Sequence, residues 1–85
     1  MAEERLGVVG IVIDDSQKAG EVNHILSLHG EIIIGRMGVP RVSHKERGVA
    51  VISLIVHGTN DEIGALTGKL GSIKGVQVKS ALSNR

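Results

Sequence analysis

The spacing of apolar residues along the chain changes between the period of a strand and the period of a helix. The stretch "RLGVVGIVID" (5–14) is apolar on both faces and predicts a buried strand. From Asp15 to Gly30 the apolar residues recur at helical spacing. One helix face then carries Ala19, Val22, Ile25, Leu26 and His29. Asp15 or Ser16 is placed to cap the start of this helix, and Gly30 stands where a left-handed C-terminal residue belongs.

The rest of the chain predicts strand, strand, helix and strand. "EIIIGRMGV" (31–39) predicts a second strand, and "VAVISLIVH" (49–57) predicts a third that is apolar on both faces. Thr59 with Glu62 three residues later is a capping-box signature, so a second helix is expected to begin there. "GVQVKSAL" (75–82) alternates as an edge strand does. The order βαββαβ predicts an α+β, ferredoxin-like sandwich, an antiparallel four-stranded sheet with two helices on one face.

The composition is that of a folded soluble protein. The 85 residues are 41% hydrophobic and 22% charged, and we expect a single domain over residues 1–85. With no Phe, Trp or Tyr, branched aliphatic side chains must fill the core, and the lack of Cys excludes disulfides and thiolate metal sites. The start has no signal-peptide layout, and the longest uncharged apolar stretch, "GVAVISLIVHG" (48–58), is too short to cross a bilayer. We therefore expect a cytoplasmic protein that does not insert into a membrane.

The helices of this fold leave one face of the sheet uncovered. The first and third strands nevertheless have apolar side chains on both faces. In the third strand, one face has Ile52, Leu54 and Val56, and the other has Val49, Val51 and Ile55. An open apolar face of this kind exceeds the few hundred Å² that soluble monomers usually expose. We therefore expect a homo-oligomer, a dimer or a tetramer.

Glycines form a stripe on the second predicted helix, at Gly64, Gly68 and Gly71. A phosphate-binding P-loop is excluded, because "GALTGKL" (64–70) has three residues between its glycines and Leu where Ser or Thr is required. Each interior glycine costs a helix about 1 kcal/mol relative to Ala. Two interpretations stay open: another backbone approaches the stripe, from the neighbouring helix or a second subunit, or the helix merely tolerates its glycines.

Two groups of residues are candidate binding sites. Asp14 and Asp15 follow the first strand, where many α/β folds bind ligands, although Asp in this place also caps a helix. The candidate ligand-binding set is Asp14, Asp15, Gly35, Gly38, Gly64 and Gly68. The basic group is Arg36, Arg41, Lys45 and Arg47, at the end of the second strand and in the polar loop 40–48. Two interpretations stay open for this group: it binds an anion, or its side chains are solvated on a hairpin loop. Because the loop has no aromatic side chain to stack a base, direct nucleic-acid binding is not expected.

The four histidines allow a metal site only between subunits. No pair has the i, i+4 spacing of a helical zinc site, and no Cys completes a ligand set. His29, His44 and His57 are the candidates for a site assembled from two chains. No residue has the nucleophile–base spacing of a catalytic site, so we expect neither enzyme activity nor a cofactor.

The most distinctive stretch is "DEIGALTGKLGSIKGVQVK" (61–79). Together with "GRMGVP" (35–40) and "IVIDD" (11–15), it resembles the family of proposed regulators of the iron-only hydrogenase system over nearly the whole chain. The resemblance implies an ACT-like domain, related in fold to the ligand-sensing domain of the nickel-responsive repressor. It also implies an oligomeric regulatory or sensory module of anaerobic bacteria, whose gene lies near hydrogenase maturation genes.

The sequence departs from the related proteins at two places, and both limit which ligand the resemblance implies. Amino-acid-binding ACT domains have Pro-Gly soon after Asp at the first strand–helix turn, and "DDSQKAG" (14–20) has no Pro. The Cys of the nickel site is also absent. The leading hypothesis is a non-enzymatic regulatory module that binds a small effector at a subunit interface and acts in transcriptional regulation through a protein partner of the hydrogenase system. The alternative is a metal-binding or hydrogenase-maturation accessory protein.

Overall fold

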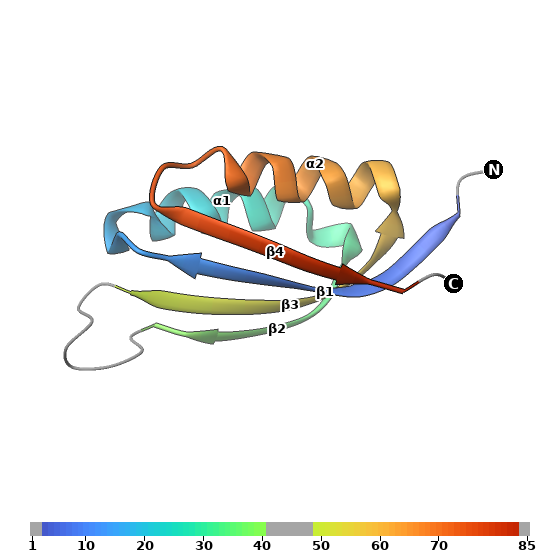
Figure 1. Cartoon of the computed structure of the whole chain (residues 1–85), viewed down its shortest axis with the longest axis horizontal. Helices are drawn as coiled ribbons and strands as arrows, with labels where there is room; N and C mark the ends of the chain where they lie inside the picture. The colour runs from blue at the N-terminus through green and yellow to red at the C-terminus, as the bar shows by residue number, and fades with distance from the viewer. Residues whose placement is uncertain (1–2, 41–48, 84–85) are drawn as a thin grey trace.

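The computed structural model describes residues 3–40 and 49–83 and confirms the predicted βαββαβ order and α+β class (Figure 1). The main elements are β1 (Glu4–Ile13), α1 (Ala19–Leu28), β2 (Ile33–Val39), β3 (Ala50–Thr59), α2 (Asn60–Gly71) and β4 (Val76–Leu82). Two short 3-10 helices flank α1, η1 (Ser16–Lys18) before it and η2 (Gly30–Ile32) after it. The sequence did not predict these two turns.

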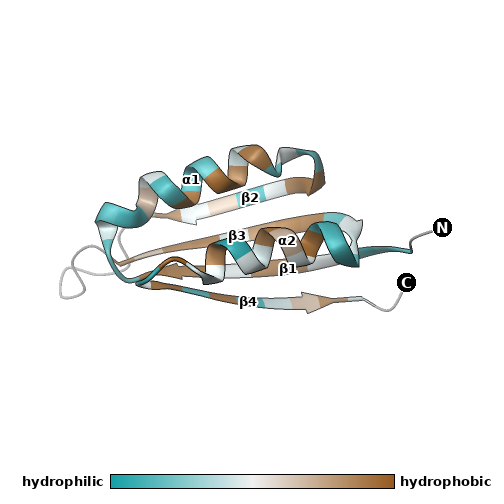
Figure 2. Ribbon diagram, turned by 90° about the horizontal axis from the view of Figure 1, so that it is seen from above, coloured by the Kyte–Doolittle hydropathy of each residue, from teal (hydrophilic) through white to brown (hydrophobic). Residues whose placement is uncertain are grey.

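The four strands form one antiparallel sheet in the order β2-β3-β1-β4. The two strands that are apolar on both faces, β1 and β3, are therefore the central pair, as the sequence predicts. Both helices lie on the same side of the sheet, with α1 along β2 and α2 over the central strands (Figure 2). No helix of the described residues lies over the opposite side of the sheet (Figure 1).

The core fills the layer between the helices and the sheet. Among residues 3–40 and 49–83, the buried side chains are fourteen and all aliphatic: Val9, Ile11, Ile13, Val22, Leu26, Ile32, Ile52, Leu54, Val56, Ile63, Leu66, Leu70, Ile73 and Val76. Burying one such side chain contributes about 1.5–3 kcal/mol. No polar or charged residue of the described ranges is buried, so apolar packing alone specifies this layer.

The start of α2 has the predicted capping box. The Glu62 backbone N–H donates to the Thr59 hydroxyl at 3.1 Å, and the Thr59 backbone N–H donates to the Glu62 carboxylate at 2.8 Å. The bond from the backbone N–H, followed by that from the Thr59 side chain, lowers the pKa of Glu62. This contribution to stability is therefore present above the ordinary pKa of Glu and is lost as the pH falls through the lower folded-state value.

The end of α1 differs from the prediction. Gly30 is not left-handed, because the only positive φ of the described residues is at Gly75 (86°). The chain instead continues into η2, which buries Ile32 beside Gly58. The placement of a left-handed residue at Gly30 was wrong for this reason, and the first two residues of the predicted second strand belong to the turn.

Candidate functional site

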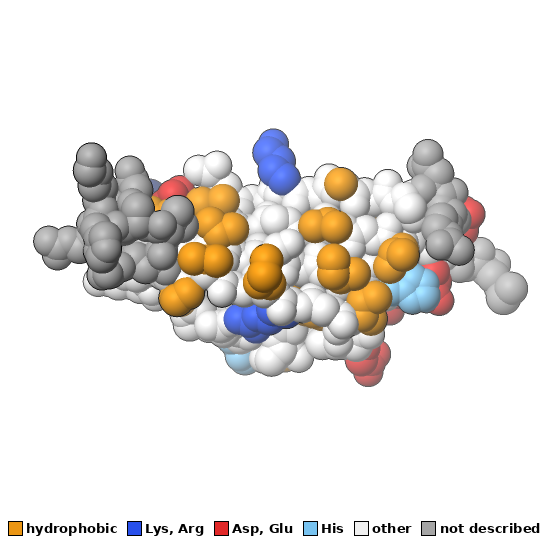
Figure 3. All heavy atoms as spheres, turned by 90° about the horizontal axis from the view of Figure 1, so that it is seen from below, with side chains coloured by type: hydrophobic (Ala, Val, Ile, Leu, Met, Phe, Trp, Pro, Cys, Tyr) orange, Lys and Arg blue, Asp and Glu red, His pale blue; other side chains and the backbone are white. Residues whose placement is uncertain are grey.

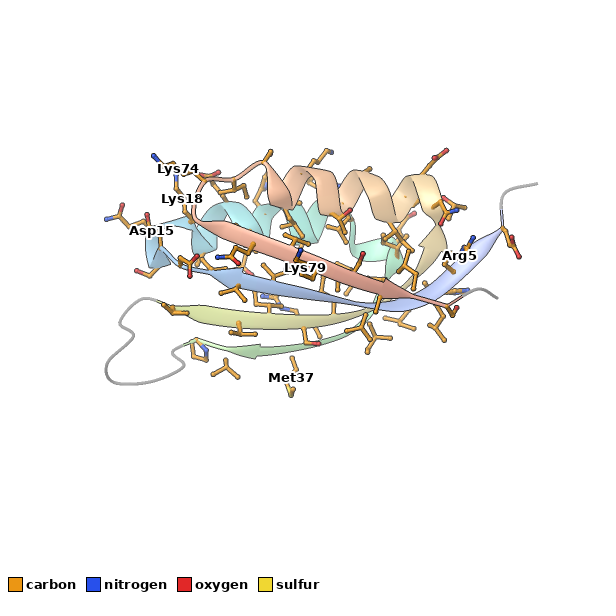
Figure 4. All side chains as sticks on the ribbon, viewed as in Figure 1. Arg5, Asp15, Lys18, Met37, Lys74 and Lys79 are labelled. Carbon is orange, nitrogen blue, oxygen red and sulfur yellow. The ribbon has the colours of Figure 1, made fainter. Side chains whose placement is uncertain are left out.

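The side of the sheet without helices is apolar. We call it the open sheet face and define it by its six exposed aliphatic or Met side chains: Leu6, Val8, Ile34, Met37, Val39 and Ile55. These side chains gather across the middle of the face seen from below (Figure 3). Met37 projects from β2 away from the helices and is 70% exposed (Figure 4). The predicted division of β3 into two apolar faces is confirmed.

Polar groups lie toward the margins of the open sheet face. At one end His57 Nε2 lies 3.6 Å from the Glu4 carboxylate, and both line a cavity of about 390 Å³ with Leu6 and Ile34. Lys79 pairs in register with Gly10 on β1 and so lies on the side of Val8. An apolar centre with a polar margin is the usual anatomy of a protein–protein interface.

A second cavity, the α1–β2 cavity, lies between the start of α1 and the end of β2. It has a volume of about 260 Å³. It is lined by Ile13, Ser16, Ala19, Asn23, Arg36, Gly38, Val39, Pro40, Ala50 and Ile52. At its rim an Arg36 guanidinium N–H donates to the Asn23 carboxamide oxygen. This bond joins β2 to α1 across the mouth of the cavity.

A third cavity of about 660 Å³ lies where the end of α1 meets the start of α2. Its lining includes three carboxylates, Glu31, Asp61 and Glu62, and His29. The Nε2 atom of His29 is buried and has no hydrogen-bond partner among the described residues. No three His, Asp or Glu side chains of residues 3–40 and 49–83 are grouped closely enough to hold a metal ion.

The predicted carboxylate pair has local partners. Asp14 accepts a hydrogen bond from Gln77 Nε2 at 3.1 Å, and its backbone N–H donates to the Gly75 carbonyl at 2.7 Å. Asp15 caps η1 by accepting from the Gln17 backbone N–H at 3.0 Å. Both residues therefore stabilise the turn between β1 and α1, where Figure 4 labels Asp15.

The other candidates are spread over the molecule. Of the six predicted ligand-binding residues, only Gly38 lines one of the three cavities described above. Gly35 lies beside Ile55 in the sheet, and Gly64 and Gly68 have open space where a Cβ would stand. His29 and His57 line different cavities. The remaining candidates lie outside the described residues: Arg41, His44, Lys45 and Arg47.

Sequence reasoning missed the polar side chains of the α1–β2 cavity that come from the first helical segment. Ser16, Ala19 and Asn23 follow the i, i+3, i+7 spacing of one helix face. That spacing is the signal from which the face could have been found. It indicates a binding site only together with Arg36, which the folded chain places beside this face.

Comparison with known proteins identifies relatives of the whole chain. The model of the TM1266-like family, proposed iron-only hydrogenase system regulators, matches residues 5–80. The solved structure of the uncharacterized protein TM1266 from Thermotoga maritima is 41% identical with a TM-score of 0.82 and covers 94% of this chain and 98% of its own. No curated protein matches the chain.

More distant structures share the fold. CPII, a nitrogen regulatory PII-like protein from Thiomonas intermedia K12 bound to ADP, AMP and bicarbonate, is 19% identical, with a TM-score of 0.53 and coverage of 98% of this chain and 96% of its own. A proposed PII-like signaling protein from Thermus thermophilus is 16% identical, with a TM-score of 0.59 and coverage of 93% and 88%. None of the helices in the described ranges is long and apolar enough to span a membrane.

Proposed function

Because this chain belongs to the TM1266-like family of proposed iron-only hydrogenase system regulators, we propose that it is a non-enzymatic regulatory module that works as a homo-oligomer. The observation that carries the proposal is the open sheet face. Its side chains remain 38% to 70% exposed in the single chain. The fold that it shares with PII-like regulatory and signaling proteins supports the regulatory role by analogy.

A second copy of this chain suits the open sheet face best. The centre of the face is apolar, and a two-fold axis would bring the same patch of both subunits together. The chain has no aromatic residue, so the face offers short aliphatic side chains of the kind that interdigitate between two packed sheets. The margin at Glu4 and His57 stays at the edge of such a pair.

Regulation then works through the assembly. An effector changes the activity of such a module only if it binds one arrangement of subunits more tightly than another. We place the output in transcription of the hydrogenase system, transmitted through a protein partner.

Size-exclusion chromatography with light scattering tests the assembly. We expect the wild type to be a dimer or a tetramer at micromolar concentration, and we expect Met37→Glu and Ile55→Glu to shift it to the monomer. Leu28 on α1 is the matched control, because it is 62% exposed and lies on a helix rather than on the sheet. Leu28→Glu should keep the wild-type mass. A monomeric wild type would overturn the proposed assembly.

A second experiment tests regulation. We expect Ile55→Glu, introduced into the chromosomal gene, to change hydrogenase transcript levels, and Leu28→Glu to leave them as in the wild type. Equal transcript levels in a deletion strain and the wild type would rule out the regulatory role, whatever the oligomeric state.

A further inference from the structure

The α1–β2 cavity has the size and lining of a small-molecule site. Its inner wall consists of Ile13, Ala50 and Ile52, all from the two central strands. Ile13 is 1% exposed and Ile52 is 6% exposed, so the packing of the core fixes this wall in place. The volume of about 260 Å³ lies just below the roughly 300–1,000 Å³ of typical ligand pockets. The volume therefore suits a compact metabolite.

The electrostatics of the cavity favour an anion. Among the described residues of the lining, Arg36 is the only charged one, and it makes no ion pair with any of them or with the rest of residues 3–40 and 49–83. Asp14 and Asp15, the acids that follow β1, accept hydrogen bonds from Gln77 and the Gln17 backbone and form no ion pair with a described residue. Among the described residues, no ion pair therefore compensates the positive charge of the Arg36 guanidinium at the cavity.

The guanidinium is also held in position. The bond to Asn23 uses one N–H of Arg36, and other N–H groups of the fork remain to bind a carboxylate in the two-point manner that arginine favours. Ser16 adds a hydroxyl to the lining. Ala19 is the first residue of α1, so the positive end of the helix dipole lies at the same cavity.

We propose that the α1–β2 cavity binds a small aliphatic monocarboxylate. The carboxylate lies against Arg36 and the alkyl chain lies on Ile13 and Ile52. An α-amino acid fits less well, because none of the described lining residues is an acid that could receive its ammonium group. A phosphate fits less well, because a single cation of the described lining faces an apolar wall. The site lies within one protomer, so it adds a ligand class to the proposed function without depending on the subunit interface.

Calorimetric titration of the full chain tests the site with butyrate as the probe, and with butyramide and inorganic phosphate as comparisons. We expect one butyrate to bind per chain and Arg36→Gln to weaken it about ten- to hundredfold, the range for a lost charge-assisted hydrogen bond. Arg36→Lys keeps the positive charge but lacks the forked guanidinium. Its affinity for butyrate should therefore lie between those of the wild type and Arg36→Gln. Lys69→Gln removes the same charge from α2, where the residue is exposed and lines none of the three cavities, and should leave the affinity within about twofold.

A second variant tests the apolar part of the site. A Cβ on Gly38 would lie 3.8 Å from Ile52 Cγ1, an ordinary contact, so the strand accepts a side chain there. Gly38→Val should fill the cavity and weaken butyrate binding at least about tenfold, with an unchanged circular dichroism spectrum.

Three results would overturn the proposal: butyramide or phosphate binding as tightly as butyrate, unchanged affinity in Arg36→Gln, or no binding of butyrate at all. Titration of Ile55→Glu separates this inference from the proposed function. Binding that is retained in that variant supports a site within one protomer. Binding that is lost with the oligomer places the ligand between subunits, which defeats this inference and leaves the proposed assembly standing.

Discussion

Single residues of β1 show how the same residue type serves different purposes in one strand. A Cβ on Gly7 would lie 2.5 Å from the Ala81 carbonyl oxygen and 2.5 Å from Leu82 Cδ2. A Cβ on Gly10 would meet nothing closer than the Lys79 carbonyl oxygen at 3.9 Å. Gly7 therefore permits the close approach of β4, whereas Gly10 has room for a side chain. The sequence presents both only as glycines that weaken a strand.

This difference predicts opposite effects of one substitution. Gly7→Ala should lower the free energy of unfolding by about 1–3 kcal/mol, because backbone atoms of β4 must move to admit the methyl group. Gly10→Ala should be neutral or raise it by up to about 1 kcal/mol, because the unfolded chain loses freedom and nothing in the folded chain clashes. Urea denaturation of both variants at one protein concentration measures the effects. Equal destabilisation would show that β4 does not approach β1 as described.

Among the elements, α2 was predicted most completely. The capping box at Thr59 fixes its start, and the buried stripe of Ile63, Leu66 and Leu70 fixes its core face. For the glycine stripe of α2, the sequence left open whether another backbone approaches it. Apart from the helix backbone and the adjacent residues, no atom of the described residues lies within 4 Å of where a Cβ would stand on Gly64, Gly68 or Gly71. Within the described part of one chain, no neighbouring backbone explains the stripe.

Alanine substitutions distinguish the two interpretations that the sequence left open. If the helix merely tolerates its glycines, Gly64→Ala and Gly68→Ala should each raise the free energy of unfolding by about 0.5–1 kcal/mol. We expect this result, because the space around both positions is open. Ala65 is exposed on the same helix, so Ala65→Gly should lower stability by a similar amount. Destabilisation by either alanine would instead show that a second subunit packs on the stripe.

The limits of sequence prediction also appear at this scale. The spacing of apolar residues was enough to predict which faces of β1, β3 and both helices are buried, because side-chain burial repeats regularly within each element. It did not find η2, since the burial of Ile32 beside Gly58 depends on contact between distant segments. The α1–β2 cavity was missed for the same reason: its lining converges only when α1 lies on β2.

The molecule as a whole has two unlike sides. The helices cover one side of the sheet over a core that contains no buried polar residue of the described ranges, and the other side presents the open sheet face (Figure 3). In this chain, one layer of helices covers a sheet that has aliphatic side chains on both sides, so the side chains of the open sheet face remain exposed. The stability of such a chain should therefore depend on association as well as on folding.

Association makes the melting temperature depend on protein concentration. For a dimer, a tenfold rise in concentration changes the unfolding free energy by about 1.4 kcal/mol per dimer. With an unfolding entropy of about 2.1 cal/mol/K per residue, the melting temperature should rise by about 3–5 °C. Calorimetry of the wild type at two concentrations measures this rise. Leu28→Glu should keep it, whereas Ile55→Glu should melt at one temperature throughout, because a charge on the open sheet face prevents a second copy from covering it. A wild type whose melting temperature does not change with concentration would show that the open sheet face stays exposed to water.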